Sequence, residues 1–271
     1  MKTDCLFIKL TSLNSAATSN IARPALQWIT SSVSFLYSFS IIHVMQKEAR
    51  AAALLERTEQ EFFETLQELN YVGKSMSLES VQYKASQLAK QIPRYSEWPQ
   101  NAEQFWNAEA LCWKGRVEKE VRDAIKNELS FLKGRNLDLG AGSVTYVDGS
   151  VVADFSEEML LLNDAMHKVA VNLEKKLPFA EESFDSITMV FVASYIQNLG
   201  NLLNEAHRVL AFGGTIVLVQ SPQPVVELHR MHYKNNYGEA ELRIMLTHLG
   251  FTVRSYEKDC GRELLFVIGE K

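Results

Sequence analysis

The chain has 271 residues, 46% hydrophobic and 23% charged, with a formal net charge of −5. This length allows one large domain or a core with a cap, and the hydrophobic content is ample for a packed interior. The acidic balance and the lack of a long basic run argue against a nucleic-acid backbone as the main partner. Cys5, Cys112 and Cys260 lie far apart without metal-ligand spacing, which indicates a reducing, cytoplasmic compartment and predicts no metal site.

Residues 1–44 are interpreted as an N-terminal extension of uncertain role. Within it, residues 25–45 are uncharged when histidine is neutral, and these 21 residues would be long enough to cross a bilayer. Polar residues such as Gln27 and Thr30 dilute the stretch. A buried or amphipathic helix is therefore favoured over membrane association, while a targeting peptide and an upstream extension before Met45 stay open.

Residues 45–125 are predicted to form a helical cap. Residues 46–69 are rich in the helix formers Ala, Glu, Leu and Gln, and their apolar positions follow a helical period. Ser77 is expected to cap a second helix, which ends at Pro93.

A third, long helix is expected to start at a capping box formed by Asn101 and Gln104 and to stop near Gly134. Its apolar side chains recur at steps of three, four or seven and are interpreted as core. Five aromatic residues gather in the cap, and they either form a wall for an apolar or aromatic substrate or pack the cap onto the core: Tyr95, Trp98, Phe105, Trp106 and Trp113.

The most informative stretch is residues 137–143, LDLGAGS, where an apolar strand runs into a Gly-x-Gly turn. Glycine has no Cβ, so the backbone of such a turn can approach a ligand closely. Asp154 stands at the end of the next apolar run, and a carboxylate at that place can accept hydrogen bonds from both hydroxyls of a ribose. The two features predict a site for a nucleoside-containing cofactor.

A dinucleotide such as NAD or FAD is disfavoured. Its fingerprint needs a third glycine or alanine, where this chain has Thr145, and an acidic residue about 20 positions further on. Asp154 follows Gly142 by only 12 residues, and residues 143–150 are too short and too β-branched for the helix that a diphosphate requires.

Four segments in register resemble class I S-adenosylmethionine (SAM) methyltransferases. They are the glycine loop at 137–143, the second strand with its helix at 151–160, LPFAEESFD at 177–185 and EAHRVLAFGG at 205–214. The resemblance covers roughly residues 126–271 and is closest to the broad methyltransferase type 11 group, which includes quinone- and biotin-pathway enzymes. It implies an α/β fold with a Rossmann-like sheet and a C-terminal antiparallel hairpin, next to the helical cap.

The resemblance also implies SAM as the cofactor. The residues matched to its site are Asp138, Gly140, Ala141, Gly142, Asp154, Phe155, Asn172 and Leu173. Asp138 is expected to order the glycine loop. The chain departs from the family in three places: the helix after the glycine loop is reduced to a loop, Phe212 replaces a proline, and Asn172 replaces an aspartate expected at the adenine amino group. The amide oxygen of Asn172 can still accept that hydrogen bond.

The core elements are expected to alternate. Strands are predicted at 136–140, 151–154, 169–173, 186–192 and 215–220, helices at 156–168, 201–210 and 239–249, and a closing hairpin at 251–256 and 264–268.

The acceptor is expected beyond the carboxyl ends of the strands. Tyr195 follows the fourth strand and is a candidate to hydrogen-bond it, while His229 and His232 follow the fifth on a segment of exposed character. A histidine of near-neutral pKa can take a proton from a hydroxyl or amine nucleophile. The alternative is that both histidines are surface or structural residues.

The predicted function is SAM-dependent methyl transfer to a small molecule by in-line displacement. Two alternatives stay open: a protein or RNA methyltransferase, and a SAM-binding regulatory or assembly module without catalysis.

Overall fold

The computed structural model describes residues 46–69 and 77–271, so the expectations for residues 1–44 lie outside the described residues. The chain divides into two compact units, residues 1–57 and 58–271. In the first unit, residues 46–57 are helical. No helix within these described ranges is both long enough and apolar enough to span a membrane.

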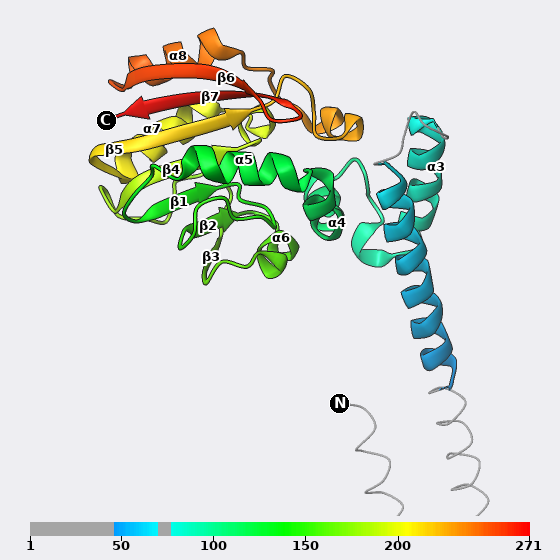
Figure 1. The fold of residues 1–271 in the computed structure, drawn as a ribbon. Helices are drawn as coiled ribbons and strands as arrows, with labels where there is room; N and C mark the ends of the chain where they lie inside the picture. Colours follow the sequence, from blue (N-terminus) through cyan, green and yellow to red (C-terminus); the bar gives the residue numbers. More distant parts are fainter. Residues whose placement is uncertain (1–45, 70–76) are drawn as a thin grey trace, which may run out of the picture. The chain divides into compact units, whose positions relative to one another are not determined.

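The second unit contains a seven-stranded sheet in the order β3-β2-β1-β4-β5-β7-β6 (Figure 1). Neighbours from β3 to β5 pair in parallel, and β7 is antiparallel to both β5 and β6. The strands are β1 (Asn136–Leu139), β2 (Val151–Asp154), β3 (His167–Ala170), β4 (Phe184–Val190), β5 (Leu210–Gln220), β6 (Thr252–Asp259) and β7 (Glu263–Glu270). This confirms the predicted Rossmann-like class I methyltransferase sheet with its antiparallel hairpin.

Helices cover both faces of the sheet (Figure 1). One face carries α7 (Leu199–Val209) and α8 (Glu239–His248), and the other carries α4 (Ala102–Arg116) and α5 (Lys119–Leu129). Side chains alternate along β5: Ile216 and Leu218 pack toward α7 and α8, whereas Val217 and Val219 pack toward α5.

The single long helix expected from Asn101 to Gly134 is wrong. Asn101 does cap α4, accepting a hydrogen bond from the backbone N–H of Gln104 at 3.1 Å, but Val117 is extended and separates α4 from α5. The guanidinium of Arg122 donates to the carbonyls of Lys114 and Val117, which satisfies the end of α4. The apolar residues of α4 and α5 keep the same helical spacing across the break. The sequence pattern alone therefore did not show where α4 ends.

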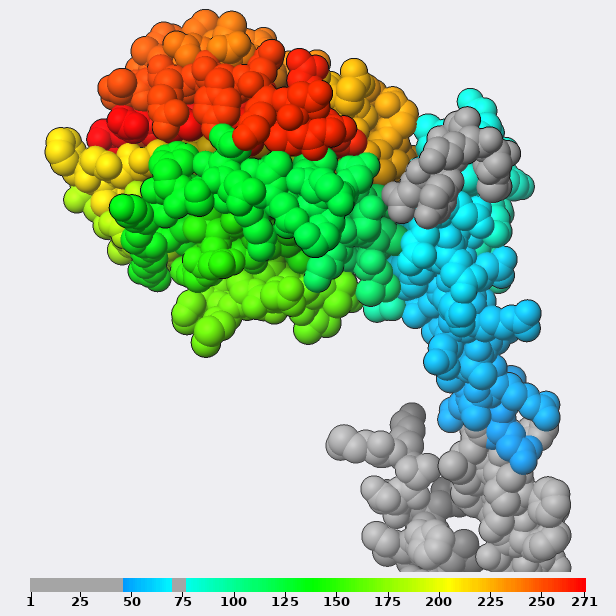
Figure 2. Space-filling model, viewed as in Figure 1, coloured from blue at the N-terminus to red at the C-terminus, as the bar shows by residue number. Residues whose placement is uncertain are grey.

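α5 also fastens the C-terminal hairpin to the sheet. The hydroxyl of Tyr256 donates to Glu128 at 2.7 Å, and Lys258 pairs with the same carboxylate. Figure 2 shows the two surfaces in contact, α5 in green beneath the orange-red hairpin. The expected boundary between cap and core at residues 125/126 falls inside α5, whose apolar face packs on the sheet.

Two further elements begin or end earlier than expected. α6 (Glu157–Leu162) is capped by Ser156 but stops at Asn163 instead of reaching 168. β3 starts at His167 because residues 167–170 pair with residues 151–154 of β2. The strand expected at 169–173 is therefore displaced by two to three residues.

The cap is built from a helix over residues 58–68, α3 (Leu78–Ala89), a 3₁₀ turn η2 (Pro93–Tyr95) and α4. Ser77 caps α3 as expected. Phe62 packs against Tyr95 and Trp98 with ring centroids 5.3 and 5.5 Å away, and Trp98 stacks on Phe105 at 6.3 Å. Tyr95, Trp98 and Phe105 are at most 2% exposed, so these three rings pack the cap.

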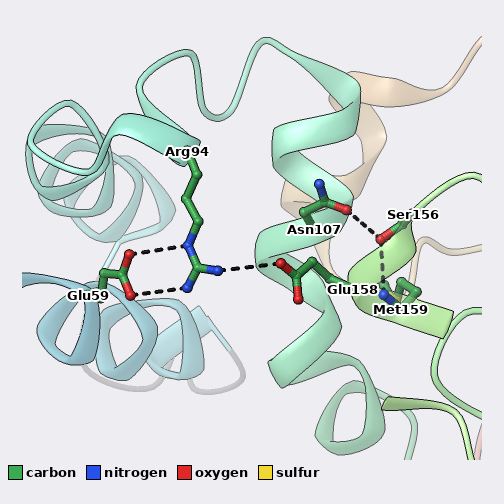
Figure 3. Close-up of polar contacts among 6 residues, drawn as sticks. All are labelled: Glu59, Arg94, Asn107, Ser156, Glu158 and Met159. Carbon is green, nitrogen blue, oxygen red and sulfur yellow. Dashed lines mark hydrogen bonds and ion pairs between the residues drawn. The ribbon is translucent and has the colours of Figure 1, made fainter. Parts of the chain in front are cut away.

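Polar contacts join the cap to α6 (Figure 3). Arg94 donates to both carboxylate oxygens of Glu59 at 3.2 and 3.1 Å and reaches Glu158 at 3.4 Å. The hydroxyl of Ser156 donates to Asn107 at 2.6 Å and also accepts from the backbone N–H of Met159. α6 is therefore capped and attached to α4 by the same side chain.

A fully buried ion pair stiffens α4. Arg116 donates to the two carboxylate oxygens of Glu109 at 2.8 Å each and to the carbonyl of Leu66 at 2.9 Å. Burial alone would raise the pKa of Glu109, but Arg116 and the bonded His229 hold it down at about 2. The carboxylate is therefore ionised in the folded protein.

Replacing one partner leaves a buried charge without compensation. We expect Arg116→Met to lower the free energy of unfolding by about 3–5 kcal/mol, measured by urea denaturation at pH 7. Because the pKa of Glu109 is depressed in the folded state, this difference is present above the unfolded pKa and shrinks as the pH falls toward 2. Arg230→Met, which breaks an exposed pair with Glu227, is the control and should cost under about 1 kcal/mol. Equal losses in the two variants would contradict the interpretation.

Candidate functional site

A cavity of about 270 Å³ lies at the carboxyl ends of β1, β2 and β4. Six of the eight residues matched to the cofactor site line it: Gly140, Gly142, Asp154, Phe155, Asn172 and Leu173. Trp106, Trp113 and Ala102 of α4 line it as well. The cap therefore forms part of the wall, and Trp106 and Trp113 are the two predicted aromatic residues that reach the cavity.

The glycine loop is held by β2. The N–H groups of Gly140 and Ala141 donate to the carbonyl of Ala153 at 2.7 and 3.3 Å, and that of Gly142 donates to Asp154 at 2.9 Å. The sequence predicts that the backbone of this turn comes close to a ligand, and the structure shows that its three N–H groups bond to β2. These three N–H groups are thus not free donors for a diphosphate, and the loop fits a cofactor that meets its Cα atoms.

Both glycines adopt backbone conformations that other residues rarely take. Gly140 has φ +69°, and a Cβ there would lie 2.5 Å from Cγ2 of Val192. Gly142 has φ +57°, and a Cβ there would lie 3.3 Å from Nε1 of Trp113. The loop is therefore packed between the end of β4 and the cap.

Asp154 is held in the cavity wall by two backbone N–H groups. Its carboxylate accepts hydrogen bonds from the backbone N–H groups of Gly142 and Ser156, both at 2.9 Å. Burial raises its pKa, and these backbone donors oppose that shift. Its oxygens hold four lone pairs, so positions stay open for a ligand's hydroxyl groups.

Asp138 and Ala141 are not among the residues that line the cavity. Asp138 is buried below the loop and accepts from the hydroxyl of Thr188 at 2.9 Å, while its second oxygen, Oδ2, has no hydrogen-bond partner. Burial raises its pKa to about 7. This position is compatible with the loop-ordering role implied by the resemblance.

Asn172 and Phe155 lie at an exposed part of the cavity wall, next to the buried Leu173. The side-chain oxygen of Asn172 accepts from the backbone N–H of Glu174 at 2.9 Å, which leaves one lone pair. Glu174 in turn accepts from the backbone N–H groups of Gln197 and Asn198. The loops after β3 and β4 are thereby joined at this side of the cavity.

The exposed character expected for His229 and His232 is wrong. Both lie in the 3₁₀ turn η4 (Glu227–His232) and are 0% and 6% exposed. Nε2 of His229 lies 3.1 Å from Oε2 of Glu109, and its ring stacks on Trp113 with centroids 5.8 Å apart. The two histidines are buried against residues of the cap, which the sequence of η4 alone does not show.

Only His232 of this pair lines the cavity. Its Nε2 lies 2.9 Å from the carbonyl of Pro99. A carbonyl only accepts, so Nε2 carries the hydrogen and Nδ1 keeps a free lone pair. Burial lowers the pKa of His232 and nearby Lys234 adds to this, while the bond to Pro99 opposes it.

Tyr195 lines the same cavity from a 3₁₀ turn, η3 (Ala193–Tyr195), and meets Trp106 edge-on at 4.9 Å between centroids. Burial and a hydrogen bond to Tyr233 raise the pKa of its hydroxyl well above the usual value. Tyr195 is therefore a hydrogen donor here and not a base.

Three residues of the site had no clear signal in the sequence. Met159 lines the cavity, and Asn163 fixes the glycine loop by donating to the carbonyl of Gly142 at 2.9 Å. Phe191 lines the cavity with φ +59°, a strained conformation for a residue with a side chain. Among the described residues, no group of three or more His, Cys, Asp or Glu side chains is placed to hold a metal ion.

The fold and the cavity define a class I SAM-dependent methyltransferase domain. Residues 137–218 match the family model described as "Methyltransferase domain". Residues 137–218 are therefore similar to a methyltransferase domain whose cofactor is SAM.

Two curated relatives are similar over part of their length. The demethylmenaquinone methyltransferase of Alkalihalophilus pseudofirmus is 31% identical over 113 residues, 39% of this chain and 46% of the relative. The malonyl-[acyl-carrier protein] O-methyltransferase 1 of Coxiella burnetii is 32% identical over 157 residues, 51% of this chain and 55% of the relative. The chain spans about half the length of these relatives.

Solved structures support the fold. A SAM-dependent methyltransferase of Thermotoga maritima superposes with a TM-score of 0.51 at 18% identity, covering 61% of this chain and 98% of that one. The DhpI-SAM-HEP complex gives a TM-score of 0.50 at 16% identity, covering 62% and 95%.

The glycine loop can be tested with two glycine substitutions that differ in one respect. Gly140→Ala combines a positive φ with a contact to Val192, whereas Gly149→Ala has φ +78° but no atom within 4 Å. We expect Gly140→Ala to weaken binding of S-adenosylhomocysteine (SAH) at least tenfold and Gly149→Ala to change it less than threefold, by calorimetric titration. Similar affinities in the two variants would show that the close packing of the loop is unimportant for the cofactor.

Proposed function

We propose that the chain transfers the methyl group of SAM to a small-molecule acceptor by in-line displacement. The observation that carries this proposal is that Asp154 and the glycine loop line the same cavity as Trp106, Tyr195 and His232. The first group offers a carboxylate for hydroxyl groups, and the second offers aromatic rings and a histidine. Cofactor and acceptor can thus meet in one cavity.

The residues present fit SAM. The carboxylate of Asp154 has open positions for the ribose hydroxyls, and Leu173, Phe155 and the amide of Asn172, which line the same cavity, are proposed to meet the adenine. Bound SAM supplies a methyl group that its sulfonium has already activated. The chain's own tasks are then to hold the acceptor in line and to exclude water.

The acceptor is proposed to be apolar or aromatic at its reacting end. Trp106 contacts Tyr195 and Trp113 edge-on, at 4.9 and 5.9 Å between centroids, and all three rings line the cavity. Aromatic walls favour flat apolar groups. The two relatives are named as methyltransferases of demethylmenaquinone and of malonyl-[acyl-carrier protein]. These names support an organic metabolite as the acceptor.

His232 is proposed as the base for a nucleophile that arrives protonated. Its hydrogen bond to Pro99 fixes the tautomer and leaves Nδ1 free to accept a proton. Its lowered pKa keeps the ring neutral near pH 7. His229 is proposed as a structural residue, since its Nε2 contacts the buried Glu109.

We also propose that the protein acts in the cytoplasm. Cys112 and Cys260 are free thiols in the structure, which supports a reducing compartment.

Binding of SAH tests the cofactor site. We expect Asp154→Ala to weaken SAH binding at least tenfold, because each lost hydrogen bond to a charged group is worth about 1.5–3 kcal/mol. Asp148→Ala, which removes an exposed carboxylate from the loop after β1, is the control and should leave the affinity unchanged. Unchanged SAH affinity in Asp154→Ala, with an intact thermal transition, would contradict the assignment of Asp154 to the cofactor site. SAH binding without methyl transfer to any metabolite of a broad screen would favour the non-catalytic module.

The role of His232 is tested by transfer rate against pH. We expect His232→Gln to bind SAH like the wild type and to lose about 10²–10⁴-fold in kcat. In the wild type, a neutral base with a lowered pKa should keep kcat constant above about pH 6.5 and lose it only at lower pH. A rate in His232→Gln equal to that of the wild type would exclude this role.

A further inference from the structure

A second, narrow gap lies next to the cofactor cavity, between the ends of β4 and β5 and the segment after η4. Phe191 and Tyr195 line both spaces, and the gap is otherwise bounded mainly by Gln220, Ser221 and Tyr233. Its volume of about 10 Å³ admits one water-sized group. An oxygen atom of a larger molecule seated in the cavity would fit, whereas a ring or a phosphate would not.

Hydrogen donors without partners gather at this gap. Nε2 of Gln220 and Oγ of Ser221 are buried and have no hydrogen-bond partner, and Gln220 is only 7% exposed. A buried polar group without a partner destabilises the folded protein. Two such groups on one small space indicate that something accepts their hydrogen bonds when the site is filled.

A cation stands beside them. Gln220 pairs with Leu265 across β5 and β7, which brings the preceding turn and its Arg262 to the same end of the sheet. Nη2 of Arg262 donates to the carbonyl of Val225, a residue of the gap, at 3.3 Å, while Nη1 is buried without a partner.

The neighbouring charges leave Arg262 uncompensated. Arg230 and Glu227 of η4 pair with each other at 2.7 Å, and no ion pair of Arg262 exists within the part of the chain that the structure describes. The guanidinium is close enough to lower the pKa of the hydroxyls of Tyr195 and Tyr233, against the larger effect of burial. The carboxylate of Glu109 acts on the pKa of Tyr195 in the opposite direction, but it is paired with Arg116. The gap is therefore rich in donors and has the guanidinium of Arg262 beside it.

We propose that this gap receives one carboxylate oxygen of the acceptor, bound by Gln220 and Ser221 with the guanidinium of Arg262 beside them. A carboxylate is acceptor-only and matches a guanidinium and an amide NH₂, and such charge-assisted bonds are about twice as strong as neutral ones. The inference rests on the proposed function and makes it more specific. Because Phe191 and Tyr195 line both the gap and the cavity, a carboxylate oxygen bound at the gap positions the acceptor while another of its atoms takes the methyl group.

The test uses a pair of probes that differ in charge and little in shape: phenylacetate and phenylacetamide. SAH binding to the full chain is measured first by calorimetry, and the binding of each probe to the SAH-loaded protein follows by ligand-observed NMR. We expect phenylacetate to bind at least fivefold more tightly than phenylacetamide. Arg262→Met should abolish this difference, and Arg230→Met, an exposed arginine of the adjacent turn, should preserve it.

The outcomes separate the two claims. Lack of SAH binding would overturn the proposed function and the subsite with it. Normal SAH binding, with the two probes equal or both absent, would overturn the carboxylate subsite alone and assign the gap to a resident water. A preference that persists in Arg262→Met would likewise exclude Arg262 as the anchor. Gln220→Leu provides a second variant, in which the preference should weaken while SAH affinity stays unchanged.

Discussion

The carboxylate of Asp154 is the interaction on which the site depends. It accepts from the N–H of Gly142 and from the N–H of Ser156, so a single side chain fixes the glycine loop and the start of α6. The hydroxyl of Ser156 then donates to Asn107 of the cap. The loop, the end of β2, α6 and α4 thus share one chain of hydrogen bonds, and a ligand that bonds to Asp154 adds to a network already in place.

The cap is part of the site because buried polar contacts tie it to the segment after β5. Glu109 of α4 holds both Arg116 and His229, while the carbonyl of Pro99 receives Nε2–H of His232. These bonds place η4 under α4, so Trp106 and His232 face the same cavity from different parts of the chain. A buried ion pair adds little net stability compared with apolar packing, yet it specifies which elements meet. Its value here lies in fixing that alignment.

The sequence sufficed for the fold class and for most of the cofactor side of the cavity. Glycines at 140 and 142, Asp154 and Asn172 lie next to strands in a local pattern, and six of the eight residues matched there do line the cavity. The break at Val117 and the burial of His229 could not be predicted from the sequence, because both arise from contacts between distant segments. Asn163 and Phe191 were missed for the same reason: an asparagine after a helix and a phenylalanine after a strand have many ordinary explanations.

The shortened loop after β1 shows how tertiary packing can replace a helix. In residues 143–150, Thr145 donates to Asn163 at 2.7 Å, and Asn163 donates back to the carbonyl of Gly142. Val144 and Tyr146 join the core formed by Trp113 of α4, the apolar face of α5 and the sheet. The loop is therefore held from the side of α6 by an amide and from the side of the cap by an indole. Because this support comes from α4, the shape of the cofactor cavity depends on how the cap is attached. Any change that moves α4 also moves the wall against which Gly142 is packed.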